Sequence, residues 1–351
     1  MLTLVIIAAV LAVLAIVALG FRLVDRTLSV PRYYGPITDH FDGSNFHNLE
    51  PPRKKGFLDF VRWQLSRRLG DWSEWTDAEP GVPPPEHVDG KDLRVTFINH
   101  ATVLIQTAGL NILTDPIWSK RASPVTWAGP KRHRSPGVRF EDLPPIDVVL
   151  ISHNHYDHLD IQTLVRLQIR HQPHFVTGLG NGAFLRAHEI PSVAELDWWE
   201  TLPVSNEVGV TCVPAKHFSG RGLSDGDRTL WCGYVIQSVA GNIYFAGDTA
   251  IGSHLAELKT RFAAFRLVVL PIGAYLPRWF MCPVHLSPVE AVDAHLLLEP
   301  TASVAMHFGT FALGDDGEWE PIVHLHEALQ SIGEGRSNFW VLEHGEGRDV
   351  P

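Results

Sequence analysis

The sequence predicts a layered α/β fold, and two observations support this prediction. Five short apolar segments are typical of buried β-strands, and a His or Asp residue follows each of them within a few positions. In layered α/β structures the ends of such strands converge on one face. With 351 residues, of which 45% are apolar and 19% charged, the chain is not disordered and can form one large domain or two ordinary ones.

The counts of charged residues, cysteines and histidines argue against several classes of protein. The formal charge of −10 argues against a general nucleic-acid-binding protein, which normally carries a basic surface. The three cysteines, Cys212, Cys232 and Cys282, are far apart and form no Cys-x-x-Cys pair, so we expect neither a disulfide framework nor a thiolate zinc site. The 19 histidines are the unusual feature, and only their arrangement can separate functional from structural ones.

The first element, residues 1–22, is predicted to be a transmembrane helix. Residues 2–21 carry no charged side chain, and a helix of this length spans ~30 Å, the thickness of a bilayer core. Three arginines follow the apolar segment, so the positive-inside rule predicts a single-pass anchor with the catalytic domain in the cytoplasm. The alternative is a cleaved signal peptide, which would make the protein periplasmic or secreted. The arginines are Arg22, Arg26 and Arg32.

Residues 23–90 are predicted to be a connector that contains an amphipathic helix within residues 53–75. Apolar residues at helical spacing form a stripe there, and arginines flank it. The helix either lies on a membrane surface or packs on the domain, and the sequence does not choose between these two. Prolines and glycines in residues 75–90 then lead into the next region. The stripe consists of Phe57, Val61, Leu65, Leu69 and Trp72, and the flanking arginines are Arg62, Arg67 and Arg68.

The clearest functional signal is the motif H-x-H-x-D-H, formed by His153, His155, Asp157 and His158. It follows the apolar segment 148–151, which is typical of a strand buried on both faces. On an extended backbone His153 and His155 project to the same side and can share one cation, while the other two residues can reach a second. Imidazole and carboxylate ligands suit zinc, and a site without thiolate remains competent for hydrolysis.

Other apolar segments lead to residues that could complete such a site. A segment over 110–113 ends in Asp115, which either orients a ligand imidazole by accepting its free N–H or belongs to a simple turn. Because strand ends converge, we expect the remaining candidates to meet the H-x-H-x-D-H motif. The segments 210–213, 242–246 and 303–306 lead to His217, Asp248 and His307, respectively.

This pattern resembles the metallo-β-lactamase superfamily, in which H-x-H-x-D-H is followed by a lone His, the Asp of a G-D-T sequence and a late His. The blocks SHNHYDHLD, LTDPIWSKRASP, GPKR, ELDWWE, FAGDT, PIGAYLPRWFM and AMHFGTFAL are similar to N-acylphosphatidylethanolamine-hydrolysing phospholipase D and its bacterial relatives. The similarity extends over residues 99–345. It implies a four-layer αββα sandwich over residues 91–347, with a dinuclear metal site at one edge.

The resemblance also implies which residues bind metal. His285 corresponds to a family His close to the metals, and two zinc ions are implied, although iron or manganese would suit the same ligands. His153, His155 and His217 would bind one zinc, Asp157, His158 and His307 would bind the other, and Asp248 would bridge both.

The activity that the resemblance implies is a zinc-dependent phosphodiester hydrolase of phospholipase D type, acting on N-acylphosphatidylethanolamine or a related phospholipid at the membrane. Two zincs would lower the pKa of a bridging water, and the hydroxide would attack phosphorus in line. Asp157 and His285 are the candidate catalytic residues, with His285 as proton donor to the leaving alkoxide. Arg278 would hold the phosphate or glycerol region, and Trp279 and Phe280 would line an acyl groove. The alternative is an ordinary apolar loop with one solvated arginine.

Alternative functions stay open. The same fold carries lactone hydrolases, cyclic-phosphodiester hydrolases and nucleases, although the negative charge disfavours RNA. Another alternative is a membrane-tethered scaffold with a structural metal, although structural zinc sites are closed and usually rich in Cys. The sequence predicts no nucleic-acid partner, and it does not decide between a monomer and a homodimer.

Overall fold

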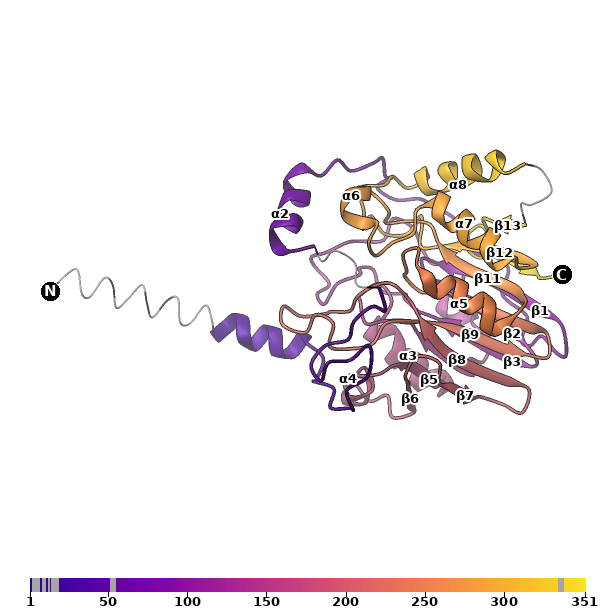
Figure 1. Cartoon of the computed structure of the whole chain (residues 1–351), viewed down its shortest axis with the longest axis horizontal. Coiled ribbons are helices and arrows are strands. Elements are labelled where there is room, and N and C mark those ends of the chain that lie inside the picture. Colours follow the sequence, from indigo (N-terminus) through magenta and orange to yellow (C-terminus); the bar gives the residue numbers. More distant parts are fainter. Residues whose placement is uncertain (2–6, 8–10, 12, 14–18, 51–54, 334–337) are drawn as a thin grey trace.

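Two seven-stranded β-sheets face each other, and helices cover their outer faces. Figure 1 shows this computed structural model, which describes the chain except residues 2–6, 8–10, 12, 14–18, 51–54 and 334–337. The largest cluster of buried apolar residues joins the two sheets and the helices over the second sheet, a second cluster lies outside the first sheet, and a third, small one contains Ile117, Ala122 and Phe311. The predicted four-layer αββα sandwich is therefore confirmed.

The first sheet has the strand order β14-β1-β2-β3-β4-β5-β6. Its strands β1 to β3 pair antiparallel, whereas β3 to β6 pair parallel. Parallel pairing brings the carboxyl ends of neighbouring strands to one edge, so the residues that follow β3 and β4 lie side by side. The bounds are β1 Leu93–Asn99, β2 Thr102–Thr107, β3 Leu110–Thr114, β4 Val148–Ile151, β5 His174–Gly178, β6 Val193–Leu196 and β14 Gly347–Asp349.

The second sheet has the matching order β13-β12-β11-β10-β9-β8-β7. Here β7 to β10 pair antiparallel, and β10 to β13 pair parallel. The carboxyl ends of β10 and β12 therefore lie on the same edge of this sheet. The bounds are β7 Thr201–Pro203, β8 Val208–Pro214, β9 Cys232–Ser238, β10 Gly241–Phe245, β11 Phe265–Pro271, β12 Ala302–Met306 and β13 Phe339–Trp340.

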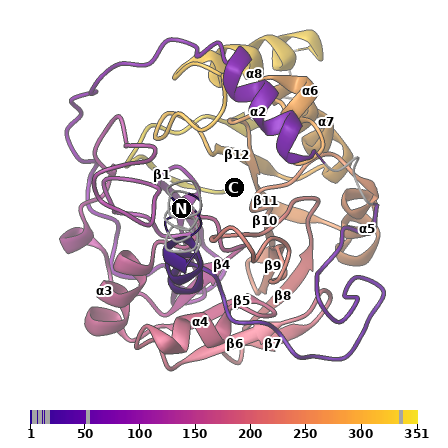
Figure 2. The same ribbon diagram turned by 90° about the vertical axis from the view of Figure 1, so that its left-hand side faces the viewer.

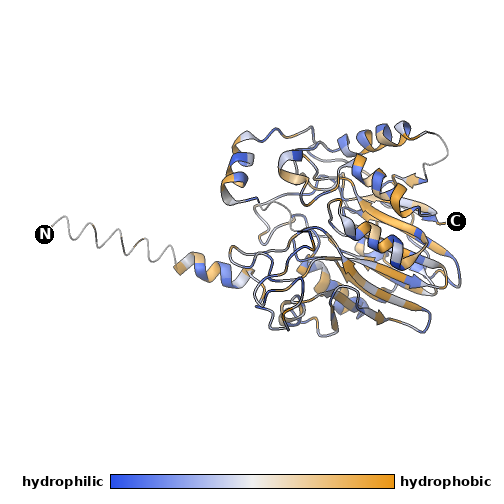
Figure 3. Ribbon diagram, viewed as in Figure 1, coloured by the Kyte–Doolittle hydropathy of each residue, from blue (hydrophilic) through white to orange (hydrophobic). Residues whose placement is uncertain are grey.

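The helices carry both hydrophobic and hydrophilic residues (Figure 3), as expected for elements that bury one face. Leu164 and Leu167 of α3 pack in the outer core of the first sheet, and α5 and α7 pack together over the second. The helices are α2 Phe57–Ser66, α3 Ile161–His171, α4 Gly182–Ala187, α5 Ser253–Phe262, α6 Arg278–Met281, α7 Pro288–Leu298 and α8 Glu320–Ser331, with a 3₁₀ turn at Phe140–Asp142.

Strand β4 confirms the prediction of a strand buried on both faces. Val148 and Leu150 belong to the core between the sheets, and Val149 and Ile151 belong to the core beneath α3. The other predicted segments lie within β3, β8 and β12 and match β10 to within one residue. The apolar runs therefore located the strands that lead into the candidate site.

The prediction of a transmembrane helix over residues 1–22 is wrong. Most of that segment lies outside the described residues, and no helix among the described ones is both long and apolar enough to cross a bilayer. The continuous helical stretch described there, residues 19–28, is only ~15 Å long and includes Arg22, Asp25 and Arg26. The structure therefore does not support the predicted single-pass anchor. The predicted membrane localisation with a cytoplasmic domain depended on this anchor and is not supported either.

Helix α2 forms within the predicted amphipathic segment and lies beside α6 (Figure 2). Trp63 is buried, stacks on Phe280 with ring centroids 4.8 Å apart, and donates its indole N–H to Oδ1 of Asp315 at 3.0 Å. Leu58 and Leu65, in contrast, are 81% and 85% exposed. One face of the helix therefore packs on the domain, and a membrane-surface role for the exposed residues stays a prediction.

Candidate metal centre

The candidate site lies where strands from both sheets end. His100, Asp115 and His307 follow directly after β1, β3 and β12, with positive φ angles of 48°, 35° and 66°. Non-glycine residues rarely adopt this left-handed conformation, which persists only where the surrounding structure holds it. All three side chains are buried. The backbone therefore turns sharply at three strand ends and places polar side chains in the interior.

Three histidines form the first group of candidate ligands. Nε2 of His153 lies 2.8 Å from Nδ1 of His155, which lies 3.3 Å from Nε2 of His217. Nδ1 of His217 lies 2.9 Å from the carbonyl oxygen of Val284, so Nδ1 carries the proton and Nε2 presents a lone pair. Three converging imidazole nitrogens are the donor set that zinc and related cations accept.

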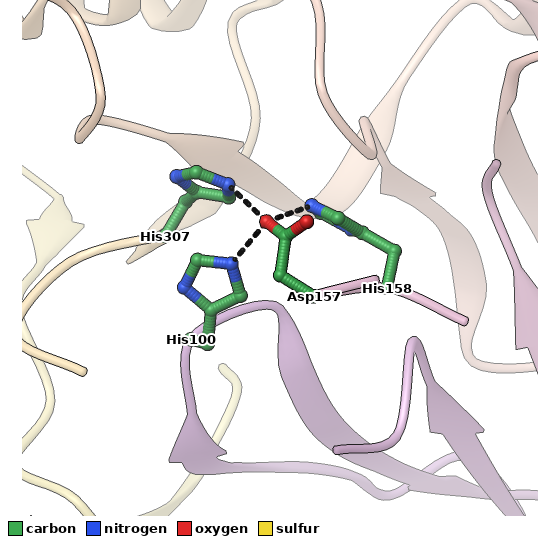
Figure 4. Close-up of side chains that lie close together, drawn as sticks. All are labelled: His100, Asp157, His158 and His307. Atoms are coloured by element: carbon green, nitrogen blue, oxygen red, sulfur yellow. Dashed lines mark hydrogen bonds and ion pairs between the residues drawn. The ribbon is translucent and has the colours of Figure 1, made fainter. Parts of the chain in front are cut away.

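The second group surrounds the carboxylate of Asp157 (Figure 4). Oδ2 of Asp157 accepts a hydrogen bond from Nε2 of His100 at 2.8 Å. The same oxygen lies 3.1 Å from Nε2 of His158 and 3.5 Å from Nε2 of His307. These four buried side chains form a second cluster that could hold a cation.

Asp248 joins the two groups. Its Oδ2 lies 3.2 Å from Nε2 of His307, 3.3 Å from Nε2 of His158 and 3.7 Å from Nε2 of His217. One buried carboxylate thus faces nitrogens of both groups, as a ligand that bridges two cations must. The structure brings together all seven side chains that the sequence predicted as ligands, and their role as ligands stays a prediction.

Asp115 orients histidines of both groups. Oδ2 of Asp115 accepts from Nδ1 of His158 at 2.7 Å and from the hydroxyl of Ser152 at 2.6 Å. Because that hydroxyl donates its proton to Asp115, its oxygen accepts from Nδ1 of His153 at 2.9 Å. Both imidazoles are thereby held through Nδ1, with Nε2 directed toward the centre. The sequence left open whether Asp115 orients a ligand or belongs to a simple turn, and the geometry fits the orienting carboxylate.

Several buried polar atoms of the centre lack a hydrogen-bond partner among the described residues. They include Nε2 of His158, Nε2 of His307 and Oδ1 of Asp248. A buried acceptor without a partner costs roughly 1–3 kcal/mol, so this arrangement is unfavourable unless something else satisfies these atoms. Nitrogen and carboxylate lone pairs that face one another inside a protein fit bound cations.

Electrostatics within the cluster favour charged carboxylates. Burial raises the pKa of Asp157, but the nearby His158 and the hydrogen bond from His100 outweigh it and hold the pKa well below its ordinary value. Burial likewise opposes ionisation of Asp248, and His307 and His158 again lower its pKa well below the usual range. Asp248 in turn helps to raise the pKa of His307 to about 9 against the effect of burial. The centre therefore holds two buried negative charges.

His285 lies at the margin of the centre. Its Nδ1 is 3.8 Å from Oδ2 of Asp248 and is buried without a hydrogen-bond partner among the described residues. Burial lowers the pKa of His285 well below its ordinary value; Asp248 opposes this effect, and His217 and His307 add to it. A neutral imidazole with an unpaired ring nitrogen is available to a substrate, and its predicted catalytic role stays a prediction.

The three predicted substrate residues contact structural elements in the described part of the chain. Arg278 pairs with Oε2 of Glu290 at 2.7 Å and donates to the backbone carbonyl of His285 at 3.2 Å. The Trp279 ring lies beneath the guanidinium of Arg62 at 4.9 Å, and Phe280 stacks on Trp63 of α2. Arg278 therefore supports the His285 loop, and the two aromatic residues attach α2.

His100 was missed by the sequence analysis. Besides its bond to Asp157, its backbone carbonyl accepts from the N–H of His307 at 2.7 Å. Burial and His307 lower the pKa of His100 to about 3, although Asp157 opposes them, so the imidazole is a neutral N–H donor. The signal that located the other candidates, a polar residue directly after an apolar strand, also applies to His100.

Comparison with known proteins agrees with this geometry. Residues 110–308, more than half of the chain, match the family model described as beta-lactamase superfamily domain. This chain belongs to the beta-lactamase superfamily. The matched range contains every predicted metal ligand, from His153 to His307, but neither His100 nor the segment before β3.

Several proteins are similar to this chain in sequence or in structure. An uncharacterized protein of Mycobacterium tuberculosis is 40% identical over 304 residues, covering 82% of this chain and 79% of the relative. N-acyl-phosphatidylethanolamine-hydrolyzing phospholipase D 1 of Caenorhabditis elegans is 38% identical over 266 residues, covering 72% of this chain and 75% of the relative. The solved metallo hydrolase of Ignicoccus hospitalis has the same fold, with a TM-score of 0.55, 21% identity, and coverage of 74% of this chain and 99% of that one. The protein is a metal-dependent hydrolase of this superfamily.

Proposed function

We propose that this hydrolase is a phosphodiesterase of phospholipase D type that cleaves N-acylphosphatidylethanolamine or a closely related phospholipid. The observation that carries the proposal is the position of Asp248, whose Oδ2 faces histidines of both ligand groups. A pair of adjacent cations suits attack on a phosphodiester, because it offsets the negative charge that repels a nucleophile. The similarity to the nematode phospholipase supports the choice of substrate class.

We further propose that two zinc ions are the native cofactors. His153, His155 and His217 would hold one, Asp157, His158 and His307 the other, and Asp248 would contact both. When bound, such a pair activates a water for attack on phosphorus and polarises the phosphoryl oxygen. Iron or manganese could use the same nitrogen and oxygen donors, so the metal content has to be measured.

The residues of the chain then have distinct tasks. Asp115 holds His158 directly and His153 through Ser152, so the ligand nitrogens are oriented before any cation binds. His285 presents a buried, neutral imidazole beside Asp248, where its ring can form a hydrogen bond to the departing alcohol oxygen. Arg278 fixes the loop that carries His285.

Apolar side chains close to the centre fit a lipid substrate. Phe218 is 41% exposed, and its ring centroid lies 4.5 Å from that of His155. The exposed Leu58 and Leu65 of α2 project from an element attached to α6, the helix that precedes the His285 loop. An acyl chain would gain ~0.8 kcal/mol for each CH₂ group buried on such surfaces.

A hydrolysis screen with metal analysis of the same sample tests the proposal. The purified full-length chain would be incubated with labelled N-acylphosphatidylethanolamine, phosphatidylcholine, cyclic nucleotides and lactones, with D248N as the matched inactive control. We expect release of an N-acylethanolamine together with phosphatidic acid, and about two zinc ions per chain. Turnover of lactones or cyclic nucleotides without any phospholipid cleavage would overturn the substrate assignment.

A further inference from the structure

Residues 25–50, which we call the N-terminal strap, lie outside the segment that matches the superfamily model. In Figure 2 the strap follows the N-terminal helix around the rim of the molecule toward α5. Phe41 and Phe46 are fully buried in the core between the sheets, so the strap is an integral part of the folded domain. Several of its polar contacts reach one loop, residues 217–227, which begins with the candidate ligand His217.

The strap holds the far end of this loop through two backbone N–H groups and one side-chain amide. The N–H of Val30 donates to Oδ2 of Asp225 at 2.9 Å, and the N–H of Phe46 donates to the carbonyl of Asp227 at 2.7 Å. The side-chain amide of Asn45 donates to the carbonyl of Gly226 at 3.1 Å. These bonds fix residues 225–227 and do not involve His217.

Asn48 holds the other end of the loop at His217 itself. Its amide nitrogen donates to the carbonyl of His217 at 2.8 Å, and its Oδ1 accepts from the N–H of His217 at 3.1 Å. Oδ1 also accepts from the indole N–H of Trp231 at 3.0 Å, which fixes the orientation of the amide. One side chain therefore satisfies both backbone groups of a single residue and restrains its position on two sides.

The ring of His217 is held at a third point, since its Nδ1 donates to the carbonyl of Val284. Two of these three restraints on His217 thus come from Asn48. Groups that orient a metal ligand typically contribute about 10–100-fold to metal affinity. We propose that Asn48 is a positioning residue of the metal centre, and that it sets the affinity of the cation position formed by His153, His155 and His217. This inference rests on the proposed metal centre.

Zinc titration of the metal-free, full-length chain tests the inference, with competition against a chromophoric chelator and metal counting per chain as the readouts. We expect N48A to weaken one of two zinc positions about 10–100-fold and to leave the other unchanged. H217A should lose the same position outright, and N48A combined with H217A should lose nothing more. With cobalt in place of zinc, the absorption bands of only one position should change in N48A.

The controls separate positioning from stability. N45A removes an amide-to-backbone bond of the same kind from the same strap, and it should keep both zinc positions at normal affinity. N48D preserves the size of the side chain but places an oxygen against the His217 carbonyl, so it should reproduce the effect even if N48A folds poorly. Normal zinc affinity in N48A and N48D, or an equal loss in N45A, would overturn the inference. If H217A also keeps both ions, the proposed metal centre itself is wrong, and the inference falls with it.

Discussion

Buried histidines lie next to carboxylates in two regions of this molecule, and the regions differ in whether the ring nitrogens are hydrogen-bonded. In the strap, His40 donates to Asp39 from Nδ1 at 2.6 Å and to Asp197 from Nε2 at 2.7 Å, so both ring nitrogens are satisfied. In the metal centre, Nε2 of His158 and of His307 face carboxylates without forming hydrogen bonds to them. A satisfied His stabilises a fold, whereas a His whose ring nitrogen stays unsatisfied inside a protein is prepared for a ligand.

The largest effect is expected from a substitution of Asp248, which tests whether the centre differs from the His40 site by binding metal. D248N removes the charge that faces both ligand groups while preserving the shape of the side chain. We expect turnover to fall by roughly 10³-fold or more, because bridging carboxylate and metal charge together account for several kcal/mol of transition-state stabilisation. The measurement is the rate of phospholipid hydrolysis with zinc content per chain, and a circular dichroism spectrum checks the fold. Turnover within tenfold of the normal rate would show that Asp248 does not bridge.

A smaller effect is expected at Asp115, which orients the ligands without facing the cation positions. D115N replaces an acceptor of three hydrogen bonds, from His158 and from the N–H and hydroxyl of Ser152, by an amide that can accept fewer. We expect zinc affinity to fall by about 10–100-fold. Isothermal titration of the metal-free protein measures it, and unchanged affinity would contradict the orienting role.

Two substitutions of His100 can separate the effect of its N–H donor from the effect of the packing of its ring. H100A leaves Oδ2 of Asp157 without its closest hydrogen bond, and we expect a loss of about tenfold in turnover or zinc affinity. H100Q keeps an N–H donor on a flexible side chain, so it should recover part of that loss. The contact from His307 N–H to the carbonyl of residue 100 persists in both variants, because it uses only backbone atoms. Equal behaviour of the two variants would assign the effect to packing instead.

The smallest effect is expected at His40, and it should depend on pH. Burial lowers the pKa of His40, but the hydrogen bonds to Asp197 and Asp39 outweigh burial and raise the pKa above its ordinary value. The charged form is therefore favoured in the folded state. Its stabilisation is fully present below pH ~6.5, the pKa of an unfolded His, and is lost as the pH rises through the higher folded-state pKa.

H40Q should remove this pH-dependent part of the stability. We expect the free energy of unfolding to decrease by about 1–3 kcal/mol at pH 5.5 and by less at pH 9. Urea unfolding of both proteins at the two pH values provides the measurement. A destabilisation that is the same at both pH values would show that His40 is not charged in the folded protein.

Most residues of the site could be predicted from the sequence, because the apolar runs that precede them mark strands and the topology of the sheets brings the ends of these strands together. Each predicted ligand follows an apolar run. The carboxyl ends of the parallel strands β4, β10 and β12 bring most of these positions together. His217 follows β8, which pairs antiparallel, and still lies beside Asp248. His100 was missed although it follows an apolar strand in the same way, because it stands in the short connection between β1 and β2, where a polar residue is typical of a simple turn. Asn48 could not be predicted, since its partner His217 lies 169 positions later in the chain.

Two other predictions depended on one-dimensional patterns that the fold uses differently. The apolar block around Trp279 suggested lipid contact, whereas the stripe over residues 53–75 left lipid contact and packing on the domain both open. In the structure Phe280 of the block stacks on Trp63 and attaches α2 to the domain. Leu65 and Leu69 of the stripe are exposed, so lipid contact by the stripe stays a prediction. Hydropathy alone cannot distinguish an apolar side chain that contacts lipid from one that contacts another helix, because both environments exclude water.

The placement of β13 and β14 has a consequence for synthesis of the protein on the ribosome. Residues 339–340 form the outermost strand of one sheet, and residues 347–349 form the outermost strand of the other, where β14 pairs with β1. During translation, β1 and β12 therefore remain open edges until these late residues emerge. Open strand edges are templates for pairing with other chains. A nascent chain stalled before residue 339 would expose one such edge on each sheet. The edge of β12 is covered once residues 339–340 have emerged, and the edge of β1 stays open to aggregation until residues 347–349 have emerged.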